Sequence, residues 1–414
     1  MPDQPIAGPL AGLRVVDCST VLAGPYCTML LGDLGAEVIK VEPPDGDATR
    51  GWGPPWVGSD VPGGARTAAY YLAVNRNKRG LRLDLKNAEG AAVLRRLLER
   101  GDVLVENFRV GGFERLGFGE EELRRLNPRL VHLAISGFGP SGPAAGLPGY
   151  DFTIQAASGL MSITGAPDED GGQPTKVGVA ISDVLTGVLG TVSVLAALVA
   201  RERPDSTTPG GGQRIDVSLL GATLASLVNQ AQNAFTTGIS PERLGNAHPN
   251  IVPYETFSTA DGAIALAVGS ERQWSRLCET LGSPGLAADP RFATNGDRVE
   301  RRATLRGILA ARFAERGTRE WLAALDAAEI PCAPINDVVT AFDSAEARAL
   351  DMTVELEHPI WGTIRQVGIP FRLSGTPASI RTPPPTLGQD TDAILVELGY
   401  SAAEVRGLRD RGVV

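Results

Sequence analysis

The sequence is poor in the residues that build metal centres, disulfide frameworks and aromatic platforms. Its 414 residues include four cysteines, three histidines and only 5% aromatic side chains. The cysteines form no C-x-x-C pair and do not cluster with the histidines, so their spacing does not indicate a zinc site. We therefore expect no bound metal and a reduced, cytoplasmic setting.

An excess of positive charge is also lacking, because the formal net charge at pH 7 is -9. This balance argues against nucleic acid or an anionic membrane as a general partner. The opening MPDQPIAGPLAGLR has neither the basic nor the apolar region of a secretory signal. One long apolar run, residues 184–200, falls short of the ~20 residues that span a bilayer, so we expect a helix buried on every side.

Short apolar runs alternate with helix-like segments in the first half of the chain. The pattern predicts strands in LRVVD, AEVIKVEPP, GDVLVENF and LVHLAISGFG, with helices at about 88–100 and 120–126. Strands separated by helices form right-handed βαβ units, so we expect an α/β domain with a Rossmann-like parallel sheet. The first turn, CSTVLAGP, lacks G-x-G-x-x-G, and a dinucleotide cofactor is not expected.

The composition changes after Arg201. Three consecutive glycines with no following GK[ST] predict a turn or linker rather than a phosphate loop. We expect a long helix at about 216–237, then a hairpin that turns at Asp261 and Gly262 inside a smaller α+β unit.

Asp183 is the single ionisable residue between Lys176 and Arg201. Aspartate is a favoured helix N-cap, and the residue could serve only that role. A carboxylate at a helix N-terminus is also held ionised by the helix dipole and backbone donors, and it can accept an acyl group as a nucleophile. The residues alone leave both interpretations open.

A second polar stretch, Gly149-Tyr150-Asp151, follows the glycine-rich loop SGFGPSGP. For Asp151 we favour a turn or an N-cap of a helix that begins near Phe152. Tyr150 suits either the core or a site. The glycines, among them Gly139 and Gly149, are expected to allow close approach of a ligand.

An ordered series of motifs resembles the family III CoA-transferases, the group of formyl-CoA transferase, carnitine CoA-transferase and the α-methylacyl-CoA racemases. The resemblance covers nearly the whole chain. Its motifs include GLRVVD, LGDLGAEVIKVE, TRGWGPP, YYLAVNRNKRGLRLDL, VENFRVGGFERLGFG, VAISDVLTG, GGGQRIDVSL, NAHPNIVPYETF and LGQDTDAIL.

The resemblance implies that Asp183 is the nucleophile, forming an acyl anhydride and then an aspartyl-CoA thioester. Racemases of the family carry G-H-D where this chain has Tyr150, and tyrosine, with an ordinary pKa of about 10, is a poor base at neutral pH. CoA transfer is thus favoured, with a racemase or isomerase as the alternative and a non-catalytic CoA-binding protein as a third reading. No cofactor is implied beyond the coenzyme A thioester, which is a substrate.

The resemblance also implies which residues meet the substrates. Val21 and Ala23 would contact the nucleotide, Asn107 and Phe108 would line the pantetheine path, and Arg115 would meet a phosphate. Arg76 and Lys78 would attract the 3′-phosphate. Gly139, Gly149, Asn246 and His248 would approach the acyl group.

Two departures concern specificity. Pro43 stands where formyl-CoA transferase has a basic residue, and the glycine-rich flap before Asn246 is missing. The chain looks most like the succinyl-CoA:glutarate branch, so succinyl-CoA and a dicarboxylic acid are the expected substrates.

The family's architecture implies an interlocked, ring-shaped homodimer in which each chain leaves its large domain and returns. We accordingly divide the chain into large CoA-binding domain (1–205), linker helix region (206–246), small α+β domain (247–335), return linker (336–374) and returning C-terminal part (375–414).

Overall fold

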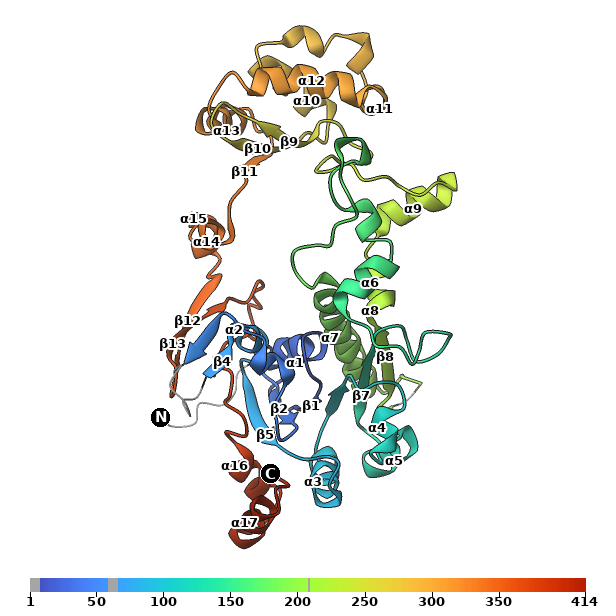
Figure 1. Cartoon of the computed structure of the whole chain (residues 1–414), viewed down its shortest axis with the longest axis vertical. Coiled ribbons are helices and arrows are strands. Elements are labelled where there is room, and N and C mark those ends of the chain that lie inside the picture. Colours follow the sequence, from blue (N-terminus) through green and yellow to red (C-terminus); the bar gives the residue numbers. More distant parts are fainter. Residues whose placement is uncertain (1–7, 59–65, 208) are drawn as a thin grey trace. The chain divides into compact units, whose positions relative to one another are not determined.

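The computed structural model describes residues 8–58, 66–207 and 209–414, which form two compact units (Figure 1). The first unit contains the chain up to Leu160, then Val177–Gln232 and Ala345–Val414; the second contains Met161–Lys176 and Asn233–Ser344. The sequence-based division therefore missed the short excursion at 161–176, and it placed the return to the first unit too late. Residues 1–7, on which the secretory-signal prediction partly rests, lie outside the described residues.

A six-stranded parallel sheet is the centre of the first unit, with strand order β5-β2-β1-β6-β7-β8. The predicted α/β class with a parallel sheet is confirmed. The strands are β1 (Arg14–Cys18), β2 (Glu37–Glu42), β5 (Lys78–Arg82), β6 (Val103–Glu106), β7 (Val131–Ser136) and β8 (Arg214–Ser218).

The predicted linker helix region is wrong in its first part. β8 pairs with β7 along its whole length, from His132 opposite Arg214 to Ser136 opposite Ser218. Its residues alternate polar and apolar, as an edge strand does. The long helix expected at 216–237 is instead this strand followed by two helices, α8 (Leu219–Ala225) and α9 (Val228–Thr237).

Helices cover both faces of the sheet, as parallel sheets require. Val15 and Val16 of β1 point to opposite faces and belong to separate hydrophobic cores. One core includes side chains of α3 (Ala88–Leu98), α5 (Glu120–Leu126), α16 (Thr391–Glu397) and α17 (Ala402–Asp410). The other includes side chains of α1 (Ala23–Asp33) and α7 (Ile181–Glu202), which Figure 1 shows beside each other.

The α1–α7 contact depends on small residues. A Cβ added at Gly187 would lie 2.8 Å from the carbonyl oxygen of Ala23, and one at Gly190 would meet the Leu133 and Cys27 side chains. Both glycines thus let the helix backbones approach closely. α7 is not buried on every side as expected, because its outer face exposes 56% of Val192 and 61% of Val199. By length and composition alone α7 would also suit a membrane span.

The second unit has its own core around Trp274 and Phe313. Its antiparallel sheet has the order β11-β10-β9, and the hairpin of β9 and β10 turns at Asp261 and Gly262 as predicted. Its strands and longer helices are β9 (Tyr254–Ser258), β10 (Ala263–Ala267), β11 (Cys332–Pro334), α10 (Glu271–Thr280), α11 (Asn295–Glu300), α12 (Arg302–Phe313), α13 (Thr318–Ala327) and α14 (Val338–Phe342).

The remaining elements of the first unit are short. They are β3 (Trp56–Gly58), β4 (Arg66–Ala68), α2 (Ala69–Leu72), α4 (Gly112–Arg115), α6 (Asp151–Ala157), α15 (Ala345–Ala349), β12 (Thr353–His358) and β13 (Gly362–Val367). The C-terminal segment docks on β5, where the Gly80 N–H donates to Asp390. The strand-and-helix element expected near the C-terminus contains helix α16 but no strand.

Candidate active site

A cavity of about 220 Å³ lies at the carboxyl ends of β1, β6 and β7. The chain moves to one side of β1 to form β2 and to the other side to form β6, so this is a topological switch point, where open α/β sheets bind ligands. The cavity is lined by Thr20, Val21, Ala23, Asn107, Phe108, Arg109, Val110, Ile135, Ser136, Gly137, Ala145, Leu147, Pro148, Gly149, Tyr150, Asp183 and Leu219.

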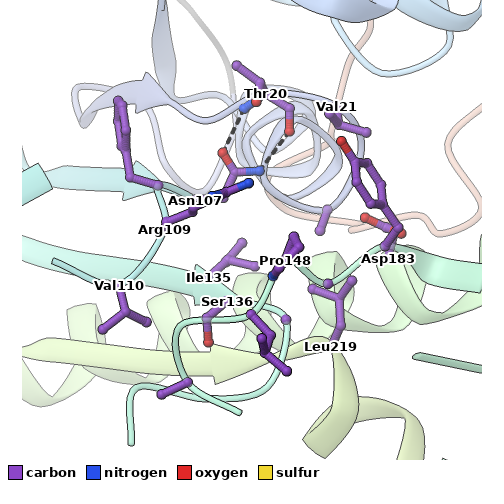
Figure 2. A pocket seen from close by; sticks show the side chains of 17 residues that line it. Thr20, Val21, Asn107, Arg109, Val110, Ile135, Ser136, Pro148, Asp183 and Leu219 are labelled. Carbon is purple, nitrogen blue, oxygen red and sulfur yellow. Dashed lines mark hydrogen bonds between the residues drawn. The ribbon is translucent and has the colours of Figure 1, made fainter. Parts of the chain in front are cut away.

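Asn107 ties the loop after β6 to the loop after β1. Its side-chain oxygen accepts from the Thr20 N–H at 2.9 Å, and its amide donates to the Thr20 carbonyl at 2.8 Å (Figure 2). This reciprocal pair uses both polar ends of the amide. It fixes the positions of these two loops, which form two walls of the cavity, relative to each other.

The loop after β1 is strained where it meets the cavity. Val21 has φ of 71°, in the left-handed region that β-branched residues avoid. Its N–H points at both carboxylate oxygens of Asp47, at 3.3 and 3.4 Å. Strain of this kind, of order 1–3 kcal/mol, persists only where the surroundings impose it.

Beneath this loop lies the buried ion cluster, which we define as Asp17, Lys40, Asp47 and Lys78. Lys40 pairs with Asp47 at 3.0 Å and donates to the Ser19 carbonyl at 3.0 Å. Lys78 pairs with Asp17 at 3.0 Å and donates to the Pro25 carbonyl at 2.9 Å. The cluster therefore binds backbone carbonyls at both ends of the loop, at Ser19 and at Pro25.

Asp183 lies in the first turn of α7, three residues after the N-cap Ala180. The interpretation of Asp183 as the N-cap is therefore wrong. The backbone N–H of Ala23, the first residue of α1, lies close enough to the Asp183 carboxylate to favour the ionised form. Close packing at Gly187, one turn further along α7, brings the two helix N-termini together.

Burial, and then the negative charge of Asp151, raise the pKa of Asp183 to about 6, and the Ala23 N–H opposes this rise. From the sequence we expected helix donors to keep the group ionised; burial raises the pKa, but to a value still below neutral pH. At neutral pH most molecules still carry the carboxylate. Such a group combines negative charge with incomplete solvation, which suits a nucleophile.

Asp151 caps α7 rather than α6. One of its oxygens accepts the Ser182 N–H at 2.9 Å, and the other accepts the Gln155 amide at 2.8 Å. Gln155 in turn accepts the Val177 N–H. The expectation that Asp151 caps the helix near Phe152 is thus wrong, because Tyr150 is the N-cap of α6. Asp151 fixes the helix that carries Asp183.

Two glycines close the base of the loop that forms one cavity wall. A Cβ built on Gly149 would lie 2.4 Å from the Gly137 Cα, so a side chain fits on neither residue. Tyr150 follows this contact, lines the cavity and is exposed. Gly139 lies outside the lining and has φ of 101°.

Comparison with protein families matches residues 10–391 to CoA-transferase family III. The chain is a member of this family. The resemblance found in the sequence is confirmed, and the protein is an enzyme of the CoA-transferase type.

Relatives of this family III CoA-transferase align along nearly its whole length. A succinate–glutarate CoA-transferase of Agrobacterium fabrum is 44% identical, over 94% of this chain and 96% of the relative. The human succinyl-CoA:glutarate CoA-transferase is 38% identical, over 98% and 90%. The crystal structure of a CAIB/BAIF family protein from Brucella suis superposes with a TM-score of 0.82 at 40% identity, covering 95% of this chain and all of the other.

The structure brings together most residues predicted to bind the coenzyme and to react. Val21, Ala23, Asn107, Phe108, Gly149, Tyr150 and Asp183 all line the cavity. Arg115 lies outside the lining, exposed, with its guanidinium beside Gly111. Asn246 and His248 belong to the second unit, so their predicted contact with the acyl group stays a prediction.

The prediction for Arg76 and Lys78 is corrected by their surroundings. Arg76 is buried and makes two bonds to Asp33, at 3.0 and 2.7 Å. Lys78 is buried in the ion cluster. Neither cation has a face free for a phosphate, because each is already used to hold the fold.

His248 is well satisfied where it stands. Its Nδ1 accepts the Asn250 N–H, and its ring lies 5.2 Å from that of Tyr254. Burial and then Arg302 lower its pKa. The neutral imidazole is thereby favoured, which fits a structural histidine.

Sequence reasoning missed Arg109 in the lining of the cavity, and Tyr70, which lies outside the lining but within electrostatic range of Asp183. Burial, followed by Asp183 and Asp151, raises the pKa of Tyr70 to about 12, so its hydroxyl stays protonated close to these carboxylates. Arg109 lines the cavity next to Asn107 and Phe108. Its place directly after the V-E-N-F motif was the available signal.

Proposed function

We propose that this enzyme moves coenzyme A from succinyl-CoA to a dicarboxylic acid, with glutarate as the first candidate, through a thioester on Asp183. The names of the relatives at 44% and 38% identity support the substrate pair. The observation that carries the mechanism is the partly buried Asp183 carboxylate, which lines the cavity and lies near the Ala23 N–H.

The proposed cycle balances without any net proton transfer. An Asp183 oxygen attacks the thioester carbonyl, and the C–S bond breaks. CoA departs as the thiolate, and the acyl group remains on Asp183 as a mixed anhydride. The thiolate then attacks the Asp183 carbonyl, which forms the aspartyl-CoA thioester and releases the donor as a carboxylate. An acceptor carboxylate reverses both steps and leaves as the new thioester, with Asp183 regenerated.

The surroundings of Asp183 support this cycle. Each attack places negative charge on an oxygen, and the Ala23 N–H at the N-terminus of α1 is a fixed donor for such charge. Because no proton is abstracted from carbon, no base is needed. An exposed tyrosine at position 150 suits transfer better than racemisation.

The coenzyme would run from the cavity past Val21, Ala23, Asn107 and Phe108, with Arg115 free to meet a phosphate outside it. No metal takes part in the proposed cycle. Among the described residues, no group of three His, Cys, Asp or Glu side chains could hold a metal ion.

Exposed apolar residues support the proposed interlocked homodimer. The free cysteines separately support a reduced, cytoplasmic setting. The outer face of α7 presents Val188, Leu189, Val192 and Val199, and α9 exposes 79% of Phe235. Neighbouring exposed apolar side chains of this kind are typical of protein interfaces. Every cysteine is a free thiol.

Mass spectrometry of CoA esters tests the proposal. Wild type and Asp183→Asn are mixed with succinyl-CoA and a panel of free acids that includes glutarate. We expect a new acyl-CoA with wild type and none with Asp183→Asn. Asp205→Asn, an exposed aspartate paired with Arg203, is the matched control and should retain transfer.

Two results would contradict the proposal. Deuterium wash-in at the α-carbon of an acyl-CoA without exchange of CoA would indicate a racemase. CoA binding with neither reaction across a broad panel would indicate a binding protein.

A further inference from the structure

Arg109 is the single cation among the residues that line the catalytic cavity in the described chain, and Asp183 is the single carboxylate. Figure 2 shows the two residues at separate parts of the lining, with Pro148 between them in this view. The remaining lining is neutral. The lining of the cavity thus has one positive and one negative side chain, at separate positions.

The Arg109 guanidinium is exposed and has no ion-pair partner among the described residues. The carboxylates that line a neighbouring hollow together with Arg109 are engaged elsewhere. Glu106 accepts the Phe108 N–H at 2.7 Å, and Arg214 takes both Asp216, at 2.9 Å, and Glu114, at 3.7 Å. The protein itself therefore leaves this positive charge unmatched.

The backbone that carries Arg109 is well fixed. Its carbonyl accepts the Gly112 N–H at 2.6 Å in a tight turn, where Gly111 has φ of 77°. On the other side, Phe108 is held by Glu106 and Asn107 by Thr20. The guanidinium is thus presented from a rigid wall, which lowers the entropic cost of binding an anion.

We propose that Arg109 binds an oxyanion of the substrate, foremost the distal carboxylate of a dicarboxylic acyl group. This inference rests on the proposed transferase function. A dicarboxylic acyl group joined to Asp183 keeps one negative charge inside the cavity, and such a charge needs a partner. A monocarboxylic acyl group would keep none.

The phosphates of coenzyme A are the other source of an oxyanion. The size of the cavity favours the carboxylate, because about 220 Å³ is less than the ~300 Å³ at which pockets for drug-sized ligands begin. The space holds an acyl group and the thioester end, and the nucleotide must extend beyond it. Arg115, outside the lining, is better placed for a phosphate.

The test compares matched substrates with Arg109→Gln. Glutarate is compared with pentanoate as acceptor, and succinyl-CoA with butyryl-CoA as donor; each pair differs by one distal carboxylate. We expect kcat/KM for glutarate to fall about 10- to 100-fold while pentanoate is unaffected. Arg109→Lys should recover part of the loss. Arg82→Gln removes another exposed arginine that forms no ion pair with the described residues, and it should behave as wild type.

The outcomes separate the two sources. Selective loss of glutarate and succinyl-CoA supports a carboxylate site, whereas equal loss of both donors with unchanged discrimination between the acids supports a phosphate site. Unchanged kinetics with all four compounds overturns the inference. Should wild type transfer nothing, the proposed function fails, and calorimetric binding of glutarate against pentanoate to wild type and Arg109→Gln decides the inference: equal affinities would overturn it.

Discussion

Two groups of charge lie on either side of one loop, and they have opposite properties. In the buried ion cluster beneath residues 19–25, each charge has a partner. Burial alone would raise the pKa of Asp17, but Lys78, Lys40 and hydrogen bonds from Ser19 and Thr28 outweigh it and lower the pKa to about 2. Across the loop, Asp183 has no cationic partner among the described residues, and its pKa rises to about 6.

The surroundings of each carboxylate determine what it is able to do. A paired carboxylate with many donors is a weak nucleophile, since its charge is already neutralised. It holds backbone in place instead. An unpaired carboxylate lowers stability but keeps its charge available for an incoming carbonyl. Partners, not burial, distinguish the two roles.

Exchanging each aspartate for asparagine should separate the two roles most clearly. Asp183→Asn should lower CoA transfer by at least about 10³-fold, because the nucleophile is lost. It should not lower the thermal midpoint at pH 8, since it removes a poorly solvated charge and retains an acceptor for the Ala23 N–H. Activity assays and thermal denaturation measure the two effects.

Asp17→Asn, unlike Asp183→Asn, should clearly lower the thermal midpoint. If Asp183→Asn destabilised the protein as much as Asp17→Asn, the contrast between the two carboxylates would be refuted.

Removing one partner of the buried ion cluster should have the next largest effect. Lys78→Met leaves Asp17 without its nearest cation and should cost about 3–5 kcal/mol in the free energy of unfolding. Urea denaturation measures it. The double variant Asp17→Asn/Lys78→Met should be more stable than Lys78→Met; a double variant of equal or lower stability would speak against the pairing.

The close contact of α7 with α1 offers a smaller perturbation. Gly187→Ala places a Cβ 2.8 Å from the Ala23 carbonyl oxygen, so the helices must separate. We expect a loss of about 1–3 kcal/mol and a lower kcat, because Asp183 moves away from the Ala23 N–H. In the control Gly190→Ala, the added Cβ meets the movable end of Leu133, and kcat should stay near that of wild type.

The smallest effect concerns pH. Transfer requires ionised Asp183, so kcat/KM should fall as the pH is lowered through about 6. The sign for stability is opposite: the folded-state pKa lies above the ordinary value, so the stabilising contribution of protonated Asp183 is present below about 4 and is lost as the pH rises through 6.

Asp151→Asn should move the midpoint of this pH profile to lower pH, because it removes the second cause of the raised pKa. The asparagine retains an oxygen for the Ser182 N–H. A midpoint unchanged from wild type would show that Asp151 does not act on Asp183 through its charge.

The sequence predicted the parts of the fold that local pattern decides. Alternating strands and helices indicated the parallel sheet, and the Asp-Gly turn indicated the hairpin. β8 was missed because RIDVS is an edge strand, and its partner strand β7 lies far from it in the sequence. The apolar residues that follow β8 favour a helix, and the predicted helix therefore began too early, inside the strand.

The site was predicted in outline, since Asp183 is conspicuous by its isolation. The sequence could not reveal that the Ala23 N–H lies near its carboxylate, because this proximity depends on the packing of α1 against Gly187. Arg76 and Lys78 were assigned to a phosphate because their partners, Asp33 and Asp17, are distant along the chain. Buried cations cannot be distinguished from free ones by composition.

The contact between Gly137 and Gly149 bears on how such an enzyme can change its substrate. The two backbones touch at the neck of the loop 138–148, so the sheet below is insulated from the length and content of the loop above. Residues of this loop, including Leu147 and Pro148, form one wall of the cavity. Grafting a loop of another length between the two glycines would therefore reshape the acyl site while the frame stays intact, which makes this segment a natural place for new specificities to arise.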